Sequence, residues 1–298
     1  MRKRLNFSIG DKAFDIIVYT ITFICLLICL YPLYLIVISS FSDPLAVAGG
    51  EVYIIPKGFS LDAYKQVFKT GNILRGYANS LFYTIVGTIL NMLVTIPAAY
   101  AFSKPKSKLR GRDVFMMMII FTMYFNGGLI PSYILFQSMG ILNTRTVILV
   151  CGLINSSNLI VARTFFASSI PKELEEAAEI DGCSIPQTFI KIVLPLSKAM
   201  LGVIMLYYAV ARWNNYTSSL YFQPMQDELH SLQMVLKKML INISNSQDTH
   251  PEMEEYYANL YNQIKYSIIV IASLPLMILY PFLQKYFDKG VMMGSVKG

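Results

Sequence analysis

Long uncharged, apolar stretches recur along the chain, and short segments between them hold most of the charge. A helix needs about 20 predominantly apolar residues to cross roughly 30 Å of hydrocarbon. The pattern therefore predicts six membrane spans. They cover Ile16–Ile38, Leu81–Phe102, Val114–Thr144, Thr146–Ala162, Ile192–Ala211 and Tyr266–Gln284. Only Lys198 interrupts the fifth, and we expect it near one end, where its ammonium group can reach the lipid headgroups.

Composition supports a membrane protein over a soluble one. Apolar residues make up 55% of the chain and charged residues 14%, whereas a soluble domain has about 45–50% and about 25%. This balance excludes a disordered chain. The 4 cysteines are scattered without a C-x-x-C pair, which excludes a disulfide scaffold. His230 and His250 have no neighbours at ligand spacing, so no metal site is expected.

The placement of basic residues predicts the orientation. Cytoplasmic segments of membrane proteins carry an excess of Lys and Arg. If the N-terminus is cytoplasmic and each span crosses once, the inner segments hold most of the 25 basic residues. These are Arg2, Lys3, Arg4, Lys12, Lys104, Lys106, Lys108, Arg110, Arg112, Arg163, Lys172, Lys191, Lys198, Lys285, Lys289 and Lys297. We therefore expect both termini in the cytoplasm, and the net charge of +7 then reflects topology rather than nucleic-acid binding.

A cleaved signal peptide is the competing interpretation of the basic N-terminus. Met1–Arg4 would supply the charged start, and Ala46–Ala48 resembles a cleavage site. The apolar core of a signal peptide has about 7–15 residues, however, and Ile16–Ile38 is longer. We therefore expect an uncleaved first span.

Helix-breaking residues lie inside the third apolar stretch. Asn126–Gly128 and Pro131 interrupt Val114–Thr144. Broken backbone at membrane depth is tolerated only where protein or a watery cavity satisfies it. Either a helix ends near Phe125 and an outer loop follows, or a broken helix borders a translocation path. The sequence leaves both open.

Polar residues in and beside the spans are candidates for a pore or substrate path. The fourth span holds the polar run Asn155–Asn158. Buried amides need partners, so they face other helices or water. The candidates are Asn91, Asn155, Asn158, Trp213 and Asn214. Hydrogen bonding between helices is the alternative role for the amides, and anchoring at the membrane interface is the alternative for Trp213.

A short acidic helix is predicted between the fourth and fifth spans. Its N-cap is Ser169 or Ile170, Pro171 takes the first helical position, and acidic residues fill the first turns. Gly182 can adopt positive φ and end it. Ser184 and the residues after it begin a second helix that continues towards the membrane.

This loop carries a recognisable pattern, Glu-Ala-Ala-x3-Gly-x9-Ile-x-Leu-Pro, in seven fixed positions. These are Glu176, Ala177, Ala178, Gly182, Ile192, Leu194 and Pro195. The pattern resembles the EAA loop of permease subunits in binding-protein-dependent ABC importers, and the resemblance extends from roughly Ile73 to the C-terminus. The tail 289–298 resembles the carbohydrate-uptake, maltose-type branch. Phe125–Thr144 is similar to permeases for larger or complex oligosaccharides.

The resemblance implies an all-α, polytopic membrane protein with six transmembrane helices, both termini inside, and the type I importer permease fold. The implied divisions are a cytoplasmic N-terminus (1–13), the first helix with its outer loop (14–72), a transmembrane domain (73–287) with the coupling loop 168–195, and a cytoplasmic tail (288–298).

The resemblance also implies partners in a bacterial cytoplasmic membrane. ABC ATPase subunits would bind the seven motif residues as the coupling site, and Glu176 would pair with a basic residue there. A second permease subunit, forming a heterodimer, would complete the pore. An extracellular solute-binding protein would deliver the carbohydrate, which in maltose-type systems is held mainly by the other permease subunit.

Catalysis and cofactors are not expected in this chain. It has no G-x-x-x-x-G-K-[ST] phosphate loop, so ATP would be hydrolysed by a separate subunit, and no G-x-S-x-G nucleophile motif. The alternative class is a secondary transporter or channel without an ATPase. That class requires ionisable residues within the spans, whereas Asp15, Lys198 and Arg212 lie near predicted span ends.

Overall fold

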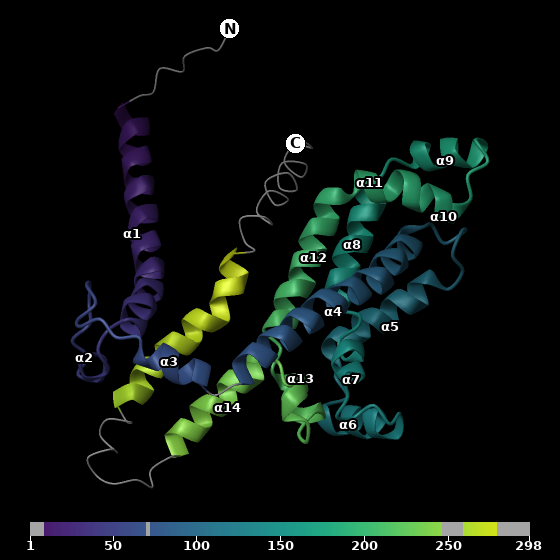
Figure 1. The fold of residues 1–298 in the computed structure, drawn as a ribbon. Coiled ribbons are helices and arrows are strands. Elements are labelled where there is room, and N and C mark those ends of the chain that lie inside the picture. The colour runs from purple at the N-terminus through teal and green to yellow at the C-terminus, as the bar shows by residue number, and fades with distance from the viewer. Residues whose placement is uncertain (1–8, 70–71, 246–258, 279–298) are drawn as a thin grey trace. The chain divides into compact units, whose positions relative to one another are not determined.

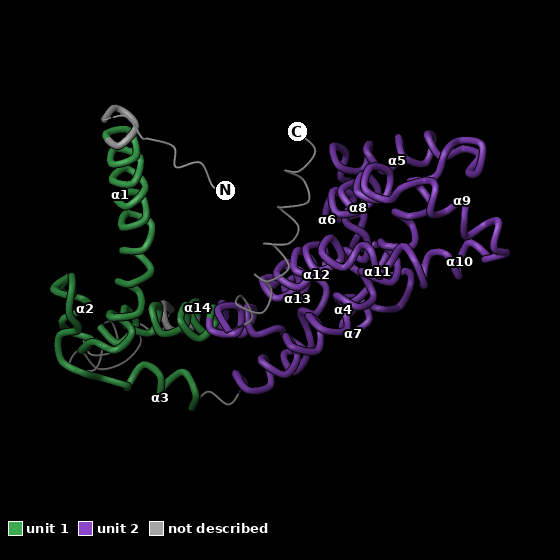
Figure 2. The backbone as a smooth tube through the Cα atoms, turned by 90° about the horizontal axis from the view of Figure 1, so that it is seen from above, with its two compact units in different colours: residues 1–70, 239–273 green, residues 71–238, 274–298 purple. Residues whose placement is uncertain are grey.

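The computed structural model describes residues 9–69, 72–245 and 259–278. This part of the chain is helical between its loops, and its only β pairing is the isolated bridge between Ser42 and Phe59. The chain divides into two compact units: residues 1–70 with 239–273, and residues 71–238 with 274–298 (Figure 2).

The first unit contains α1 (Ile9–Ser40), α2 (Pro44–Ala48), α3 (Asp62–Lys69), the end of α14 (Leu232–Asn245) and most of a helix over residues 259–278. A buried glutamine organises it: the side-chain amide of Gln263 donates to the carbonyl of Ser42 at 2.7 Å and to those of Ser40 and Ser60 at 3.3 Å each. The amide therefore supplies hydrogen-bond donors to backbone carbonyls at and beyond the end of α1, where no helical N–H is available to them.

Helix α1 has the surface of a membrane span. Residues 13–40 have a mean hydropathy of 2.7 in their most apolar window, and only 6% of that window is buried. Phe14, Tyr19 and Ile28 are each about two-thirds exposed or more. An apolar face of this extent is stable only against lipid or another apolar surface.

The second unit is built around α4 (Asn72–Ser103), which packs against α8 (Ser156–Ser169) and α12 (Lys198–Trp213) (Figure 1). Its other helices are α5 (Arg112–Tyr124), α6 (Leu129–Ser138), α7 (Arg145–Val150), α9 (Lys172–Ile180), α10 (Ile185–Thr188), the π-helix Phe189–Val193, α11 (Leu194–Leu196), α13 (Thr217–Phe222), the 3₁₀ turn Asp227–Leu229 and the start of α14. Ala99, Ala162 and Ile204 are fully buried where α4, α8 and α12 meet.

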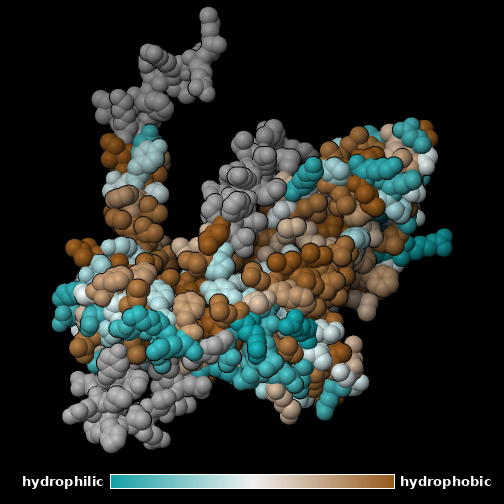
Figure 3. Space-filling view, viewed as in Figure 1, coloured by the Kyte–Doolittle hydropathy of each residue, from teal (hydrophilic) through white to brown (hydrophobic). Residues whose placement is uncertain are grey.

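Hydrophobic and hydrophilic residues are separated on the surface of the second unit. In the visible face of the second unit, hydrophobic residues cover the middle and hydrophilic ones gather towards the ends (Figure 3). This is the distribution expected of a body whose middle lies in hydrocarbon.

The predicted spans are recovered in part. Ala13–Ser40 and Asn72–Ser103 are single helices able to cross a membrane, so the second predicted span begins nine residues earlier than the uncharged stretch from Leu81. Two further candidates are bent pairs: α5 with α6, at 117°, and Ile185–Leu196 with α12, at 85°. The described residues thus hold two to four candidate spans by length and composition. The predicted sixth span lies partly outside the described residues.

The third and fourth apolar stretches are not single helices. The third breaks at Phe125–Gly128, where Gly128 has a φ of +92°, and continues as α6 rather than as a loop alone. The fourth breaks at Cys151–Asn155, between α7 and α8. Apolarity could not reveal the second break, because the groups that satisfy it lie elsewhere in the sequence.

Leu159 offers a test of the core between α4, α8 and α12. It is 1% exposed, whereas Val161 on the same helix is 48% exposed. Leu159→Ala should lower the free energy of unfolding by about 2–5 kcal/mol, because it leaves a cavity. Val161→Ala should cost less than about 1 kcal/mol. Thermal unfolding of the purified protein in detergent measures both, and equal losses would contradict this packing.

Candidate functional site

Helices α9 and α10 form an exposed turn at one end of the second unit (Figure 1). Helix α9 spans Lys172–Ile180, with Pro171 at the N-cap rather than at the predicted first helical position. Gly182 ends it as predicted: its φ is +79°, and the N–H of Cys183 donates to the carbonyl of Ala178 at 2.9 Å. Ser184 then begins α10 with a reciprocal capping box to Gln187.

The acidic residues of α9 divide between two faces. Glu175 and Glu179, four residues apart, face the loop after α4: Lys104 pairs with Glu175, and Lys108 with Glu179 at 2.7 Å. The hydrogen bond from Lys108 holds the pKa of the Glu179 carboxyl below its usual range. Glu173 and Glu176 are exposed, and neither forms an ion pair with a described residue. Glu176 is therefore available to a partner.

The motif residues are not equally accessible. Glu176, Ala177, Gly182 and Pro195 are exposed, Ile192 and Leu194 are half-buried, and Ala178 is 3% exposed. Ile180 and Ile185 flank the turn and are 87% and 70% exposed. Neither isoleucine is among the site residues predicted from the sequence, although an apolar residue on each side of Gly182 can be read there.

A buried guanidinium forms the second polar centre. Arg212, on α12, is 7% exposed. Its Nε and Nη2 donate to Asn91 Oδ1 on α4, at 3.0 and 2.9 Å. Its remaining donors reach the carbonyls that end α7, including those of Leu149 and Cys151 at 3.0 Å each. A guanidinium thus occupies the negative end of a helix, where unpaired carbonyls otherwise remain.

Neighbouring side chains complete the break between α7 and α8. Asn91 Nδ2 donates to the carbonyls of Gly152 and Leu153, at 2.8 Å each. The Asn155 N–H donates to the Tyr208 hydroxyl at 3.1 Å, and that hydroxyl is also hydrogen-bonded to the Thr95 hydroxyl, 2.7 Å away. The unwound backbone is thereby satisfied from both α4 and α12.

These contacts show where the five residues predicted for a pore or substrate path lie in the structure. Asn91 is fully buried and bonded, as the helix–helix alternative describes, and Trp213 is 1% exposed beside Tyr77. Trp213 is therefore a packed residue, and its part in a substrate path or as an interfacial anchor stays a prediction. Asn155 is exposed and caps α8 through Asn158 N–H, Asn158 is half-buried, and Asn214 is exposed at the end of α12. The five do not converge on one site.

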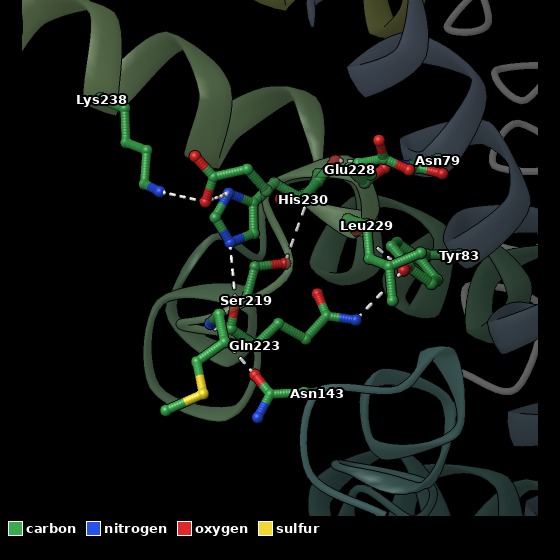
Figure 4. Close-up of polar contacts among 12 residues, drawn as sticks. Asn79, Tyr83, Asn143, Ser219, Gln223, Glu228, Leu229, His230 and Lys238 are labelled. Atoms are coloured by element: carbon green, nitrogen blue, oxygen red, sulfur yellow. Dashed lines mark hydrogen bonds and ion pairs between the residues drawn. The ribbon is translucent and has the colours of Figure 1, made fainter.

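The opposite end of α4 holds the loop that follows α13 (Figure 4). Asn79 donates to the carbonyls of Glu228 and His230, at 2.7 and 3.1 Å, and Tyr83 donates to that of Leu229 at 2.8 Å. His230 is 1% exposed, and its Nε2 lies 2.9 Å from the carbonyl oxygen of Gln223. These bonds give His230 a structural role, and no group of metal-binding side chains occurs among the described residues.

The family of inner membrane components of binding-protein-dependent transport systems matches residues 70–293. The chain belongs to this family. The Bacillus subtilis (strain 168) polygalacturonan/rhamnogalacturonan permease YtcP is 36% identical, over 97% of this chain and 99% of that protein. Protein LplC of the same organism is 40% identical, over 91% of this chain and 90% of its own length.

A solved structure has the same fold. It is a bacterial ABC transporter that imports the acidic polysaccharide alginate, and the matched chain has a TM-score of 0.81 and 34% identity, covering 95% of this chain and 99% of that one. The protein is therefore an importer permease subunit of an inner membrane, a transport component rather than an enzyme.

Arg212→Met tests the buried centre of this permease. It leaves Asn91 Oδ1 and several carbonyls unpaired, so we expect a loss of about 3–5 kcal/mol in the free energy of unfolding. Arg75 is the control: its ion pair with Glu228 is exposed, and Arg75→Met should cost less than about 1 kcal/mol. Thermal unfolding in detergent compares them, and an unchanged midpoint for Arg212→Met would contradict the assigned role.

Proposed function

We propose that the permease is one half of the membrane channel of an ATP-driven importer for an oligosaccharide. The observation that carries this is the α9–α10 turn, in which Glu176, Ala177 and Gly182 are exposed. Glu175 and Glu179, by contrast, form ion pairs with lysines of the loop after α4. The turn would dock on a separate ABC ATPase subunit and receive its motion. Ile192, Leu194 and Pro195 would carry that motion into α12.

The proposed topology has six spans with both termini in the cytoplasm. Helix α4 has 32 residues, so it is roughly 48 Å long at about 1.5 Å per residue and exceeds the hydrocarbon thickness. Its first turns hold the loop after α13, and its last residues adjoin α9. This supports placing the α9–α10 turn in the cytoplasm and the loop after α13 outside, in line with the basic loop Ser103–Asp113.

An oligosaccharide is the proposed substrate because similar proteins carry such names. YtcP is named for polygalacturonan and rhamnogalacturonan, and the AraQ proteins, 26% identical, are named for arabinooligosaccharides. The proposed partners are two ABC ATPase subunits, a second permease and an extracellular solute-binding protein. We place residues 73–287 as the transmembrane domain and 168–195 as its coupling loop.

Gly182→Val tests the coupling turn in the assembled complex. A Cβ at this position meets no atom within 4 Å, so the change strains only the backbone, at φ +79°. We expect sugar uptake and binding-protein-stimulated ATP hydrolysis to fall together, and Gly182→Asn to retain more of both because Asn tolerates this region.

Gly140 provides the matched control for this test. It also has positive φ (+68°) and open space around the missing Cβ, but it lies between α6 and α7. Gly140→Val should leave coupling intact. Unchanged uptake and hydrolysis in Gly182→Val would overturn the coupling role of the turn.

Reconstitution tests the importer as a whole. Proteoliposomes with both permeases, the ATPase subunits and the binding protein should take up oligosaccharides in an ATP-dependent manner. Calorimetry of the binding protein against neutral and uronic-acid oligosaccharides identifies the substrate to use. A working complex of this chain with ATPase subunits alone would replace the proposed heterodimer with a homodimer, and uptake driven by an ion gradient without ATP would reject the proposal.

A further inference from the structure

The loop after α4 is joined to the coupling helix by two ion pairs. Lys104 Nζ contacts both carboxylate oxygens of Glu175, and Lys108 pairs with Glu179. The first pair is the more enclosed: the side chains of Lys104 and Glu175 are 15% and 23% exposed, against 52% and 67% for Lys108 and Glu179. An enclosed ion pair is screened less by water and salt than an exposed one, so it holds its two side chains together more firmly.

Lys104 also connects α9 and the end of α4 to an aromatic cluster, which consists of Tyr100, Phe166 and Phe189. Its ammonium lies 3.7 Å from the centroid of the Tyr100 ring. That ring stacks on Phe189 of the π-helix at 4.9 Å and meets Phe166 of α8 edge-on at 5.7 Å. Lys104 is therefore in contact with α9 and, through Tyr100, with α8 before the α9–α10 turn and with the π-helix after it.

A backbone hydrogen bond and the partial burial of its ammonium group also hold Lys104 beside Glu175. Arg112 Nη1 donates to the Lys104 carbonyl at 3.0 Å and so anchors the loop. Burial lowers the pKa of the Lys104 ammonium, while the Glu175 carboxylate opposes that shift. The ammonium thus depends on Glu175 as its compensating charge, and removing either partner leaves the other half-buried and unpaired.

We propose that Lys104 is a positioning residue for coupling: acting through Glu175, it fixes α9 to the end of α4, so that force delivered to α9 moves α4 together with α8 and α12. This rests on the coupling role proposed above for the α9–α10 turn. Without the pair, α9 pivots about its exposed turn, and ATP hydrolysis is only partly converted into movement of the pore helices.

Charge reversal in the reconstituted complex tests this. Lys104→Glu and Glu175→Lys should each keep the ATPase subunits bound and ATP hydrolysis measurable, but lower the sugar transported per ATP hydrolysed by about fivefold or more. The double reversal restores the opposite charges and should recover most of that ratio. Lys104→Met keeps the aliphatic stem over Tyr100 and should show the same loss. It serves as the test if Lys104→Glu does not assemble.

Lys106 is the matched control. It lies on the same loop but pairs with Asp113, with both side chains exposed, and not with α9. Lys106→Glu changes the loop charge equally and should leave the transport ratio unchanged. An equal fall in Lys106→Glu, or an unaltered ratio in Lys104→Met, would overturn the proposal.

The two levels of the hypothesis separate cleanly. If Gly182→Val lowers sugar uptake and ATP hydrolysis but Lys104→Met leaves the transport ratio unchanged, the positioning role fails and the coupling turn stands. If neither has an effect, the coupling turn fails and the positioning role fails with it.

Discussion

The second unit depends on one buried cation, Arg212. A guanidinium is costly to bury unless its donors are bonded. Here they donate to carbonyls at the end of α7 and just beyond it, and to Asn91, so one side chain joins α12, α4 and the interrupted fourth stretch. Gly87 permits this contact, because a Cβ there would lie 3.0 Å from Arg212 Nε and 3.1 Å from its Cδ.

This constraint explains how the break in the fourth apolar stretch is tolerated. Free N–H and C=O groups are costly at membrane depth. Asn91, Tyr208 and Arg212 supply partners for residues 148–155, and each reaches the break from a helix that is itself continuous there. The break is therefore held in place by α4 and α12, which also pack on α8.

The two ends of α4 connect the two loops of functional interest. Asn79 and Tyr83 hold the loop after α13, and Lys104 holds α9. At 32 residues, this helix is roughly 48 Å long and exceeds the hydrocarbon thickness of a membrane. Between these two ends, α4 contributes the buried amide of Asn91, bonded to Arg212, and apolar residues such as Ile96 and Ala99 that pack in the core.

Local patterns in the sequence determined the membrane class, the helical fold, the family and the α9–α10 turn, because hydropathy, caps and the Gly182 stop act over a few neighbouring residues. The first helix and the end of α9 lie close to where those patterns placed them. The positions of Asn91, Trp213 and Arg212 depended on residues far away in the chain, as did the division of the α9 acids. Hydropathy assigns a polar residue a depth but not a partner. Only the tertiary structure could show that Asn91 is bonded to Arg212, that Trp213 is enclosed, and that Glu175 is paired with Lys104 while Glu176 is free to meet another protein.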